Sequence, residues 1–135
     1  MSAAVPGPAI VVTAAVVKRD DHYLVTRRPE YAHLAGYWEF PGGKCEPGES
    51  HEDCLRREIR EELDTEARVH GEIFAVTHAY EERVVELHFF RCTLAGTPQP
   101  VLGQEMRWVA RDELAALKFP PADAELIRRL QEGLF

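Results

Sequence analysis

The sequence predicts an α/β fold in which a mixed sheet is flanked by helices. Two observations carry this prediction. Runs rich in β-branched and aromatic residues, separated by turn-forming residues, occur along most of the chain. Helical periodicity is clear over residues 51–63, and a further helix is expected at the end of the chain. The sum is a mixed sheet with helices packed on it.

Length and composition predict one globular domain over residues 1–135. A chain of 135 residues can bury one core but not two. Hydrophobic residues make up 45% and charged residues 29%, a balance that excludes disordered and collagen-like classes. Residues 1–8, which include Pro6, Gly7 and Pro8, are expected to form a loose leader.

Net charge, apolar runs and cysteine content limit the kinds of partner and the cellular compartment that we expect for this protein. A net charge of −7 without a basic stripe argues against a nucleic-acid polymer as partner. The apolar run Ala9–Val17 is too short to span a membrane. Three cysteines without Cys-x-x-Cys spacing indicate neither a disulfide framework nor a zinc site, so a reducing, cytoplasmic compartment fits best.

Several strands are predicted from β-rich runs. Ile10–Val17 and Tyr23–Thr26 are expected to form a hairpin across the polar turn Lys18–Asp21, followed by a loop over Pro29–Gly36. The next segment, with Gly42, Gly43, Pro47 and Gly48, is expected to be irregular. Further along, the expected elements are an antiparallel pair, Ala67–Val76 with Val84–Leu94, and a short strand, Met106–Val109.

The helix predicted over residues 51–63 has a defined start and a buried face. Ser50 offers an N-cap, with Asp53 at the capping-box position. Leu55, Ile59 and Leu63 repeat at i, i+4 and i+8, a stripe that faces the core. A brief helix after Arg111-Asp112 and a last helix over Asp123–Glu132 complete the chain.

Three carboxylates share one face of the middle helix. Glu58, Glu61 and Glu62 stand at i, i+3 and i+4, where each like-charged pair costs roughly 0.2 to 0.5 kcal/mol unless a cation intervenes. Oxygen ligands suit Mg²⁺ or Mn²⁺. On the helix alone, a solvated, ion-paired surface is the alternative. The preceding glycine spacing is that of a P-loop, but Glu49 stands where the phosphate-binding lysine belongs, so a P-loop is rejected.

Residues 38–67, WEFPGGKCEPGESHEDCLRREIREELDTEA, resemble the Nudix box, G-x5-E-x7-R-E-U-x-E-E-x-G-U, where U is a bulky aliphatic residue. The matching positions, in order and spacing, are Gly43, Glu49, Arg57, Glu58, Ile59, Glu61 and Glu62. Asp64 and Thr65 depart from the pattern. Asp tolerates a left-handed helix terminus, so the departure strains the helix end more than it threatens a metal site.

The likeness extends beyond the box to the MutT-like branch of the Nudix hydrolases. It includes Thr26-Arg27-Arg28, His33 and Phe119-Pro120-Pro121-Ala122-Asp123. This likeness implies the Nudix α/β/α sandwich, and it implies a role for each residue that matches a functional position of the family. The implied metal ligands are the carbonyl of Gly42, Glu58, Glu61, Glu62 and Glu105. The implied catalytic residues are Glu61, Arg57, Glu105 and Glu49. The implied substrate contacts are Arg28, His33, Phe40, Ala122 and Asp123. We assign no role to Lys44, His78, Tyr80 or His88, and Trp38 and Trp108 are expected in the core or a pocket wall.

The resemblance implies a Mg²⁺-dependent enzyme, with Mn²⁺ a possible substitute, that converts a nucleoside triphosphate and water to the monophosphate and pyrophosphate. The alternatives are hydrolysis of a nucleoside diphosphate derivative and a catalytically silent nucleotide sensor. The expected partner is a small nucleotide, and the protein is expected to be a monomer or a homodimer.

Which nucleotide base the enzyme prefers is expected to depend on Asp123, a position at which some MutT-like relatives have Asn. An ionised Asp suits cytosine, whereas a protonated one imitates Asn and accepts 8-oxo-dGTP. A plain N-cap of the last helix, without any contact to the base, is the third possibility.

Overall fold

The computed structural model describes residues 9–32 and 34–135. In these residues the central strand β1 is paired along both edges, running parallel to β6 and antiparallel to β2 and β4. The sheet is therefore mixed, which confirms the sequence prediction. The described residues form seven strands: β1 (Ile10–Arg19), β2 (His22–Arg27), β3 (Trp38–Glu39), β4 (Gly42–Lys44), β5 (Ala67–Ala79), β6 (Val84–Leu94) and β7 (Met106–Ala110).

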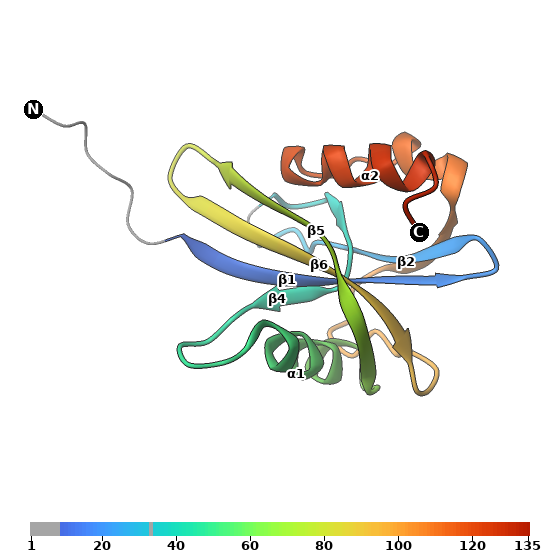
Figure 1. The fold of residues 1–135 in the computed structure, drawn as a ribbon, viewed down its shortest axis with the longest axis horizontal. Helices are drawn as coiled ribbons and strands as arrows, with labels where there is room; N and C mark the ends of the chain where they lie inside the picture. Colours follow the sequence, from blue (N-terminus) through green and yellow to red (C-terminus); the bar gives the residue numbers. More distant parts are fainter. Residues whose placement is uncertain (1–8, 33) are drawn as a thin grey trace, which may run out of the picture.

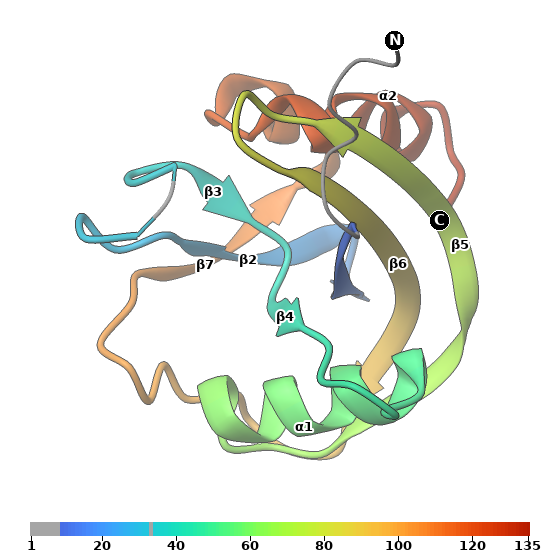
Figure 2. The same cartoon turned by 90° about the vertical axis from the view of Figure 1, so that its left-hand side faces the viewer.

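Helices lie on both sides of this sheet. The helix α1 (His51–Leu63) lies on one side, and α2 (Ala124–Gln131) lies on the other with the C-terminal part of the chain (Figure 1). Two 3-10 helices, η1 (Arg111–Ala116) and η2 (Pro121–Asp123), lead from β7 into α2. Seen from the side, β5 and β6 curve from the α2 layer to the α1 layer (Figure 2). This is the predicted α/β/α sandwich.

The period-2 alternation of β1 separates two cores. Ala14 and Val16 pack with buried residues of α2 such as Leu126. Ala15 and Val17 point to the opposite side, where they pack with the leucine and isoleucine stripe of α1. Because successive side chains of a strand point to opposite faces, one continuous apolar run supplies both cores.

The ends of α1 follow the sequence prediction. The hydroxyl oxygen of Ser50 accepts a hydrogen bond from the Asp53 N–H at 3.1 Å. Asp64 adopts the left-handed conformation with φ 51°, and its N–H donates to the Arg60 carbonyl. Thr65, the second departure from the Nudix pattern, is 5% exposed, and its hydroxyl accepts the Gly96 N–H at 3.1 Å. A buried hydroxyl is thus satisfied where the pattern has an aliphatic side chain.

The prediction of irregular structure is wrong for Gly42–Lys44, because these residues form β4 against β1. A Cβ atom at Gly42 would lie 2.0 Å from the Thr13 carbonyl oxygen. Glycine here allows close pairing of two backbones, a use that its turn-forming character conceals. Pro47 and Gly48 do lie in a turn.

Other boundaries differ by a few residues. β1 and β5 continue to Arg19 and Ala79, beyond the predicted ends at residues 17 and 76. The predicted brief helix is 3-10, and the last helix spans Ala124–Gln131 instead of residues 123–132. The predicted leader, residues 1–8, and His33 lie outside the described residues. Within the described ranges, no helix has the length and apolar character needed to cross a membrane.

Candidate active site

A cavity of about 400 Å³ lies where β3, β4, α1 and η2 meet. The short strand β4 leads into the loop before α1, so it brings the helix glutamates beside the central strand. Seven of the predicted site residues line the cavity: Arg28, Phe40, Gly42, Glu58, Glu62, Ala122 and Asp123. The volume is within the range of sites that hold small ligands.

Glu58 and Glu62, one helical turn apart, present their carboxyl groups to the cavity. Burial, together with the nearby carboxylates of Glu39 and Glu58, raises the pKa of Glu62 to about 8. Burial also raises the pKa of Glu58, against the effect of Arg57. A Cβ atom at Gly43 would lie 2.4 Å from the Glu58 carboxylate, so glycine lets this group lie against β4.

Arg57 organises the acids beside the cavity. Its Nε and Nη2 donate to the two carboxylate oxygens of Glu49 at 2.7 and 2.9 Å. Its Nη1 lies 3.0 Å from Glu58 and 3.2 Å from Glu61. The guanidinium, with help from the Glu46 N–H, lowers the pKa of Glu49 to about 2. Glu61, in contrast, has a 57% exposed side chain, so the three helix glutamates occupy different surroundings.

Arg28 contacts an acid that the sequence analysis did not assign. Its Nη1 lies 2.6 Å from the carboxylate of Glu39, which also lines the cavity. Burial raises the pKa of Glu39, and Arg28 opposes that rise. The pairing of Thr26 on β2 with Glu39 on β3 places Glu39 and the nearby Arg28 together at the cavity. In the sequence, the position of Glu39 just before the Gly42-Gly43 pair was the only sign that it could belong to the site.

Asp123 occupies the N-cap position of α2, as the capping interpretation expects, but its side chain makes no capping hydrogen bond. The side chain is 4% exposed and lines the cavity, and burial together with Glu39 raises its pKa to about 8, against Arg28. Phe40 forms part of the wall beside it, stacked on Phe119 at 5.4 Å between ring centroids.

Glu105 lies away from this cavity. It lines a second one, of about 460 Å³, which shares Arg28, Glu39 and Glu62 with the first. Its carboxylate lies 2.9 Å from Arg107 and 3.4 Å from Arg27, with 42% of the side chain exposed. The structure thus brings Glu105 near Glu62 but not to Glu58, and its assignment as a metal ligand or base stays a prediction.

Comparison with known proteins identifies the family. A family model described as NUDIX domain matches residues 12–129. The chain belongs to the NUDIX domain family. The CTP pyrophosphohydrolase of Escherichia coli (strain K12) is 37% identical over 87% of this chain and 88% of the relative. The 8-oxo-dGTP diphosphatase of Haemophilus influenzae is 35% identical over 90% of each chain.

Solved structures of Nudix relatives agree with the fold. The solution structure of the E. coli ORF135 protein superposes with a TM-score of 0.81 at 35% identity, covering 92% of this chain and 89% of that one. The crystal structure of the MutT protein from Methanosarcina mazei Go1 superposes with a TM-score of 0.84, covering 96% and 97%. At 22% identity, this second likeness supports the fold alone.

Nudix hydrolases typically use a divalent metal, and the acids of this cavity fit one. Glu39, Glu58 and Glu62 oppose one another's ionisation in a partly buried space, and a hard cation bound by carboxylate oxygens would remove that repulsion. Among the described residues, however, Glu58, Glu61 and Glu62 do not bring their oxygens within 4.8 Å of one another. In this Nudix site Arg57 is the countercharge of Glu58 and Glu61.

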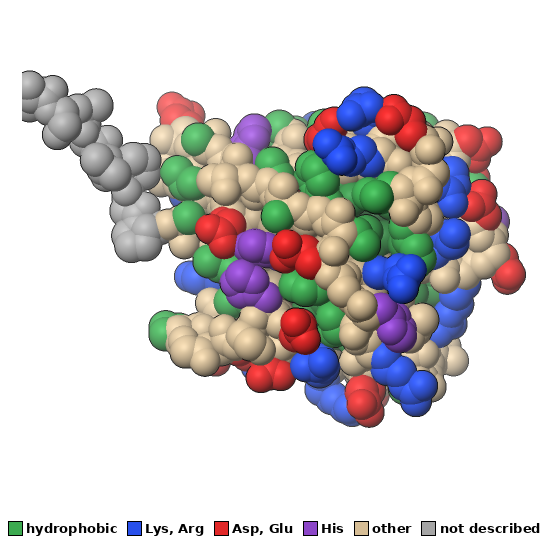
Figure 3. Space-filling model, in the orientation of Figure 1, with side chains coloured by type: hydrophobic (Ala, Val, Ile, Leu, Met, Phe, Trp, Pro, Cys, Tyr) green, Lys and Arg blue, Asp and Glu red, His purple; other side chains and the backbone are tan. Residues whose placement is uncertain are grey.

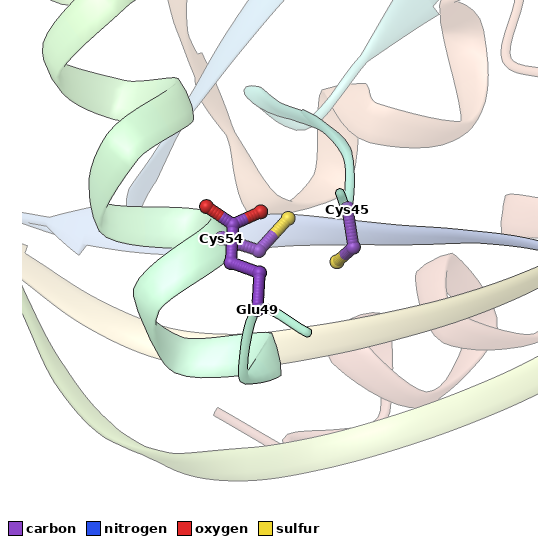
Figure 4. Close-up of side chains that lie close together, drawn as sticks. All are labelled: Cys45, Glu49 and Cys54. Atoms are coloured by element: carbon purple, nitrogen blue, oxygen red, sulfur yellow. The ribbon is translucent and has the colours of Figure 1, made fainter. Parts of the chain in front are cut away.

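Another cluster joins Cys45 and Glu49 of the loop before α1 to Cys54 of α1, and their ligand atoms lie within 4.8 Å of one another (Figure 4). All three cysteines of the chain are free. Burial and the neighbouring thiol of Cys54 raise the pKa of Cys45 to about 12, and Arg57 already binds Glu49. Without a bound metal ion, the Cys45 thiol therefore stays protonated at neutral pH.

Some cavity residues of this Nudix domain were missed. Tyr80, Arg83 and Lys44 line the cavity together with Glu39. The sequence analysis assigned no role to Tyr80 or Lys44. Burial raises the pKa of the Tyr80 phenol, which lies close to Ala122. Tyr80 directly follows β5, which contacts η2. Nothing in the sequence around Tyr80 indicates that it lines a cavity.

Proposed function

We propose that this chain hydrolyses a nucleoside triphosphate to the monophosphate and pyrophosphate with Mg²⁺ or Mn²⁺. One observation carries the proposal: Glu58 and Glu62 share a cavity with Arg28 and Asp123. The arrangement offers oxygen ligands for a cation at one end and groups for a nucleotide at the other. The similarity to proteins named CTP pyrophosphohydrolase and 8-oxo-dGTP diphosphatase supports this reaction.

Different residues of the site serve different parts of the reaction. Glu58 and Glu62 would hold the cation, with the Gly42 carbonyl as a further ligand. When bound, the cation neutralises phosphate oxygens and acidifies water. Glu61, exposed beside Arg57, is suited to accept a proton from the attacking water. Arg57 and Glu49 act as positioning residues, because their bidentate pair holds the loop against α1.

Cationic side chains at the cavity would receive the triphosphate. Arg28, Lys44 and Arg83 all line it. A guanidinium offers a fork of donors that matches phosphate oxygens. Arg28 is held by Glu39, so its orientation is set before a substrate arrives.

We further propose that Asp123 reads the base in its protonated form. A pKa of about 8 keeps this buried carboxyl neutral at pH 7, where it offers both a donor and an acceptor. The pair complements the N7–H donor and O6 acceptor of oxidised guanine, which favours 8-oxo-dGTP. Cytosine nucleotides are the second candidate, because a relative is named CTP pyrophosphohydrolase.

The reaction is tested by measuring monophosphate and pyrophosphate release with Mg²⁺ and again with excess chelator. We expect equal amounts of both products with Mg²⁺ and no turnover with chelator. Full turnover in chelator would contradict the metal requirement. Turnover of nucleoside diphosphate derivatives alone would favour the alternative enzyme, and nucleotide binding without turnover would favour a sensor.

The base is tested with dGTP, 8-oxo-dGTP, dCTP and CTP at pH 7 and pH 9. We expect wild type to prefer 8-oxo-dGTP at pH 7 and to lose that preference at pH 9. Asp123→Asn should keep the preference at both pH values, because an amide does not ionise. Identical rankings for both proteins at both pH values would remove Asp123 from base selection.

A further inference from the structure

Three side chains with metal-binding atoms meet on the α1 side of the sheet. His51 begins α1, Glu72 lies on β5 and His88 lies on β6. One ligand atom from each lies within 4.8 Å of the other two. The imidazole rings are 4.2 Å apart between centroids, and Figure 3 shows two histidines side by side with acidic side chains on either side.

A fourth residue, Glu86, completes the arrangement around His88. The Nδ1 of His88 lies 2.7 Å from Glu72, and its Nε2 lies 2.7 Å from Glu86. A protonated imidazole donates to both carboxylates, whereas a neutral one has a single N–H and turns the lone pair of its other ring nitrogen towards a carboxylate. A metal ion bound at that nitrogen and at the carboxylate would take the place of the missing proton.

We propose that His51, Glu72 and His88 form a second metal site, selective for a transition-metal ion such as Zn²⁺. Two imidazoles and one carboxylate are a ligand set that suits Zn²⁺, whereas the oxygen ligands of the Nudix cavity suit Mg²⁺. Glu86 would accept the remaining N–H of His88, as carboxylates do behind metal-binding histidines. None of the four residues lines either cavity described above.

The site has a structural consequence. An ion bound there joins the first residue of α1 to two strands of the sheet. The ion binds the folded chain and not the unfolded one, so it raises the stability of the fold by mass action. His51, the first residue of α1, directly follows the loop that carries Glu49. A metal ion bound to His51 would therefore stabilise the position of this loop from outside the cavity.

The test is a calorimetric Zn²⁺ titration of the full chain in excess Mg²⁺, which occupies oxygen-ligand sites. We expect saturable binding of one equivalent to wild type. His51→Gln, Glu72→Gln and His88→Gln should each weaken binding at least tenfold, and Glu86→Gln by roughly tenfold. His70→Gln is the matched control, since His70 is a β5 histidine bonded to Thr93 outside the cluster. It should bind as wild type does.

Co²⁺ spectra identify the ligands independently. We expect the absorption of nitrogen and oxygen ligands, without a thiolate-to-cobalt band. A thiolate band in wild type would place the ion at Cys45 and Cys54 and overturn the proposal. Absence of saturable Zn²⁺ binding to wild type, or unchanged affinity in both histidine variants with native circular dichroism spectra, would overturn it equally.

Discussion

Glu49 and Glu62 belong to one motif, yet their carboxyl groups have opposite pKa shifts. The pKa of Glu49 is about 2, because Arg57 donates two hydrogen bonds to it. The pKa of Glu62 is about 8, because burial and two neighbouring acids disfavour its charge. A glutamate is therefore a permanent anion in the loop before α1, at Glu49, and a group that binds a proton in the cavity, at Glu62.

The difference separates positioning from chemistry. A carboxylate whose two oxygens both accept from one arginine, as in Glu49, has little charge to offer a cation, but it holds a loop in place. A carboxyl group that is destabilised as an anion binds a cation in exchange for its proton.

Glu62→Gln should lower turnover by at least about a hundredfold, because an amide cannot replace the charge that holds the metal. Without metal, the melting temperature of the variant should be no lower than that of wild type, because the substitution removes an acid whose charged form is disfavoured by burial and by Glu39 and Glu58. Steady-state rates and melting curves measure both effects. Glu66→Gln is the control, because this acid is exposed and pairs loosely with Arg60 at 4.0 Å. A near-normal rate in Glu62→Gln would refute its assignment.

Arg57→Lys should lower turnover by roughly tenfold or more, because an ammonium cannot reproduce the bidentate contact with Glu49. The pKa of Glu49 should rise towards its ordinary value, which carboxyl NMR titration would detect. Arg56→Lys is the matched neighbour, since Arg56 pairs with exposed Asp53 on the outer surface. If both variants behave alike, Arg57 has no positioning role.

Asp123→Asn should change how stability depends on pH. In wild type the folded-state pKa is raised from 3.8 to about 8, so between these values the folded chain binds more protons than the unfolded one. Its stability therefore falls as pH rises through this window. The variant lacks this contribution and should be more stable at pH 8 by up to about 5 kcal/mol, because each of the roughly four pKa units corresponds to about 1.4 kcal/mol. Denaturant unfolding at pH 4 and pH 8 measures the difference in free energy of unfolding between variant and wild type. The same difference at both pH values would contradict a raised pKa for Asp123.

Arg128→Ala should have the smallest effect. Arg128 pairs with Glu125 and with Glu132, the latter at 2.6 Å, and these contacts raise its pKa. All three side chains are substantially exposed, where solvent screens ion pairs. We expect unchanged activity and no measurable change in melting temperature. A clear loss would show that exposure is a poor guide to which ion pairs matter here.

Sequence reasoning was accurate where interactions are local. The helix over 51–63, its Ser50 cap and its apolar stripe depend on residues a few positions apart, and all were confirmed. It was wrong for Gly42–Lys44, because strand pairing with β1 overrides the turn preference of glycine. It also missed Glu39, which has no periodic pattern and reaches the cavity through pairing of β2 with β3.

The residue pattern alone was enough to predict the order of the longer strands and helices. It also contains the spacing of Glu49, Arg57, Glu58 and Glu62, and therefore indicates the family. It could not decide which acids are charged. Asp123 and Glu39 are 84 positions apart, and only the folded chain places them at one cavity where each disfavours the other's ionisation. Electrostatic coupling depends on distance and burial in space, and these arise from contacts between distant segments.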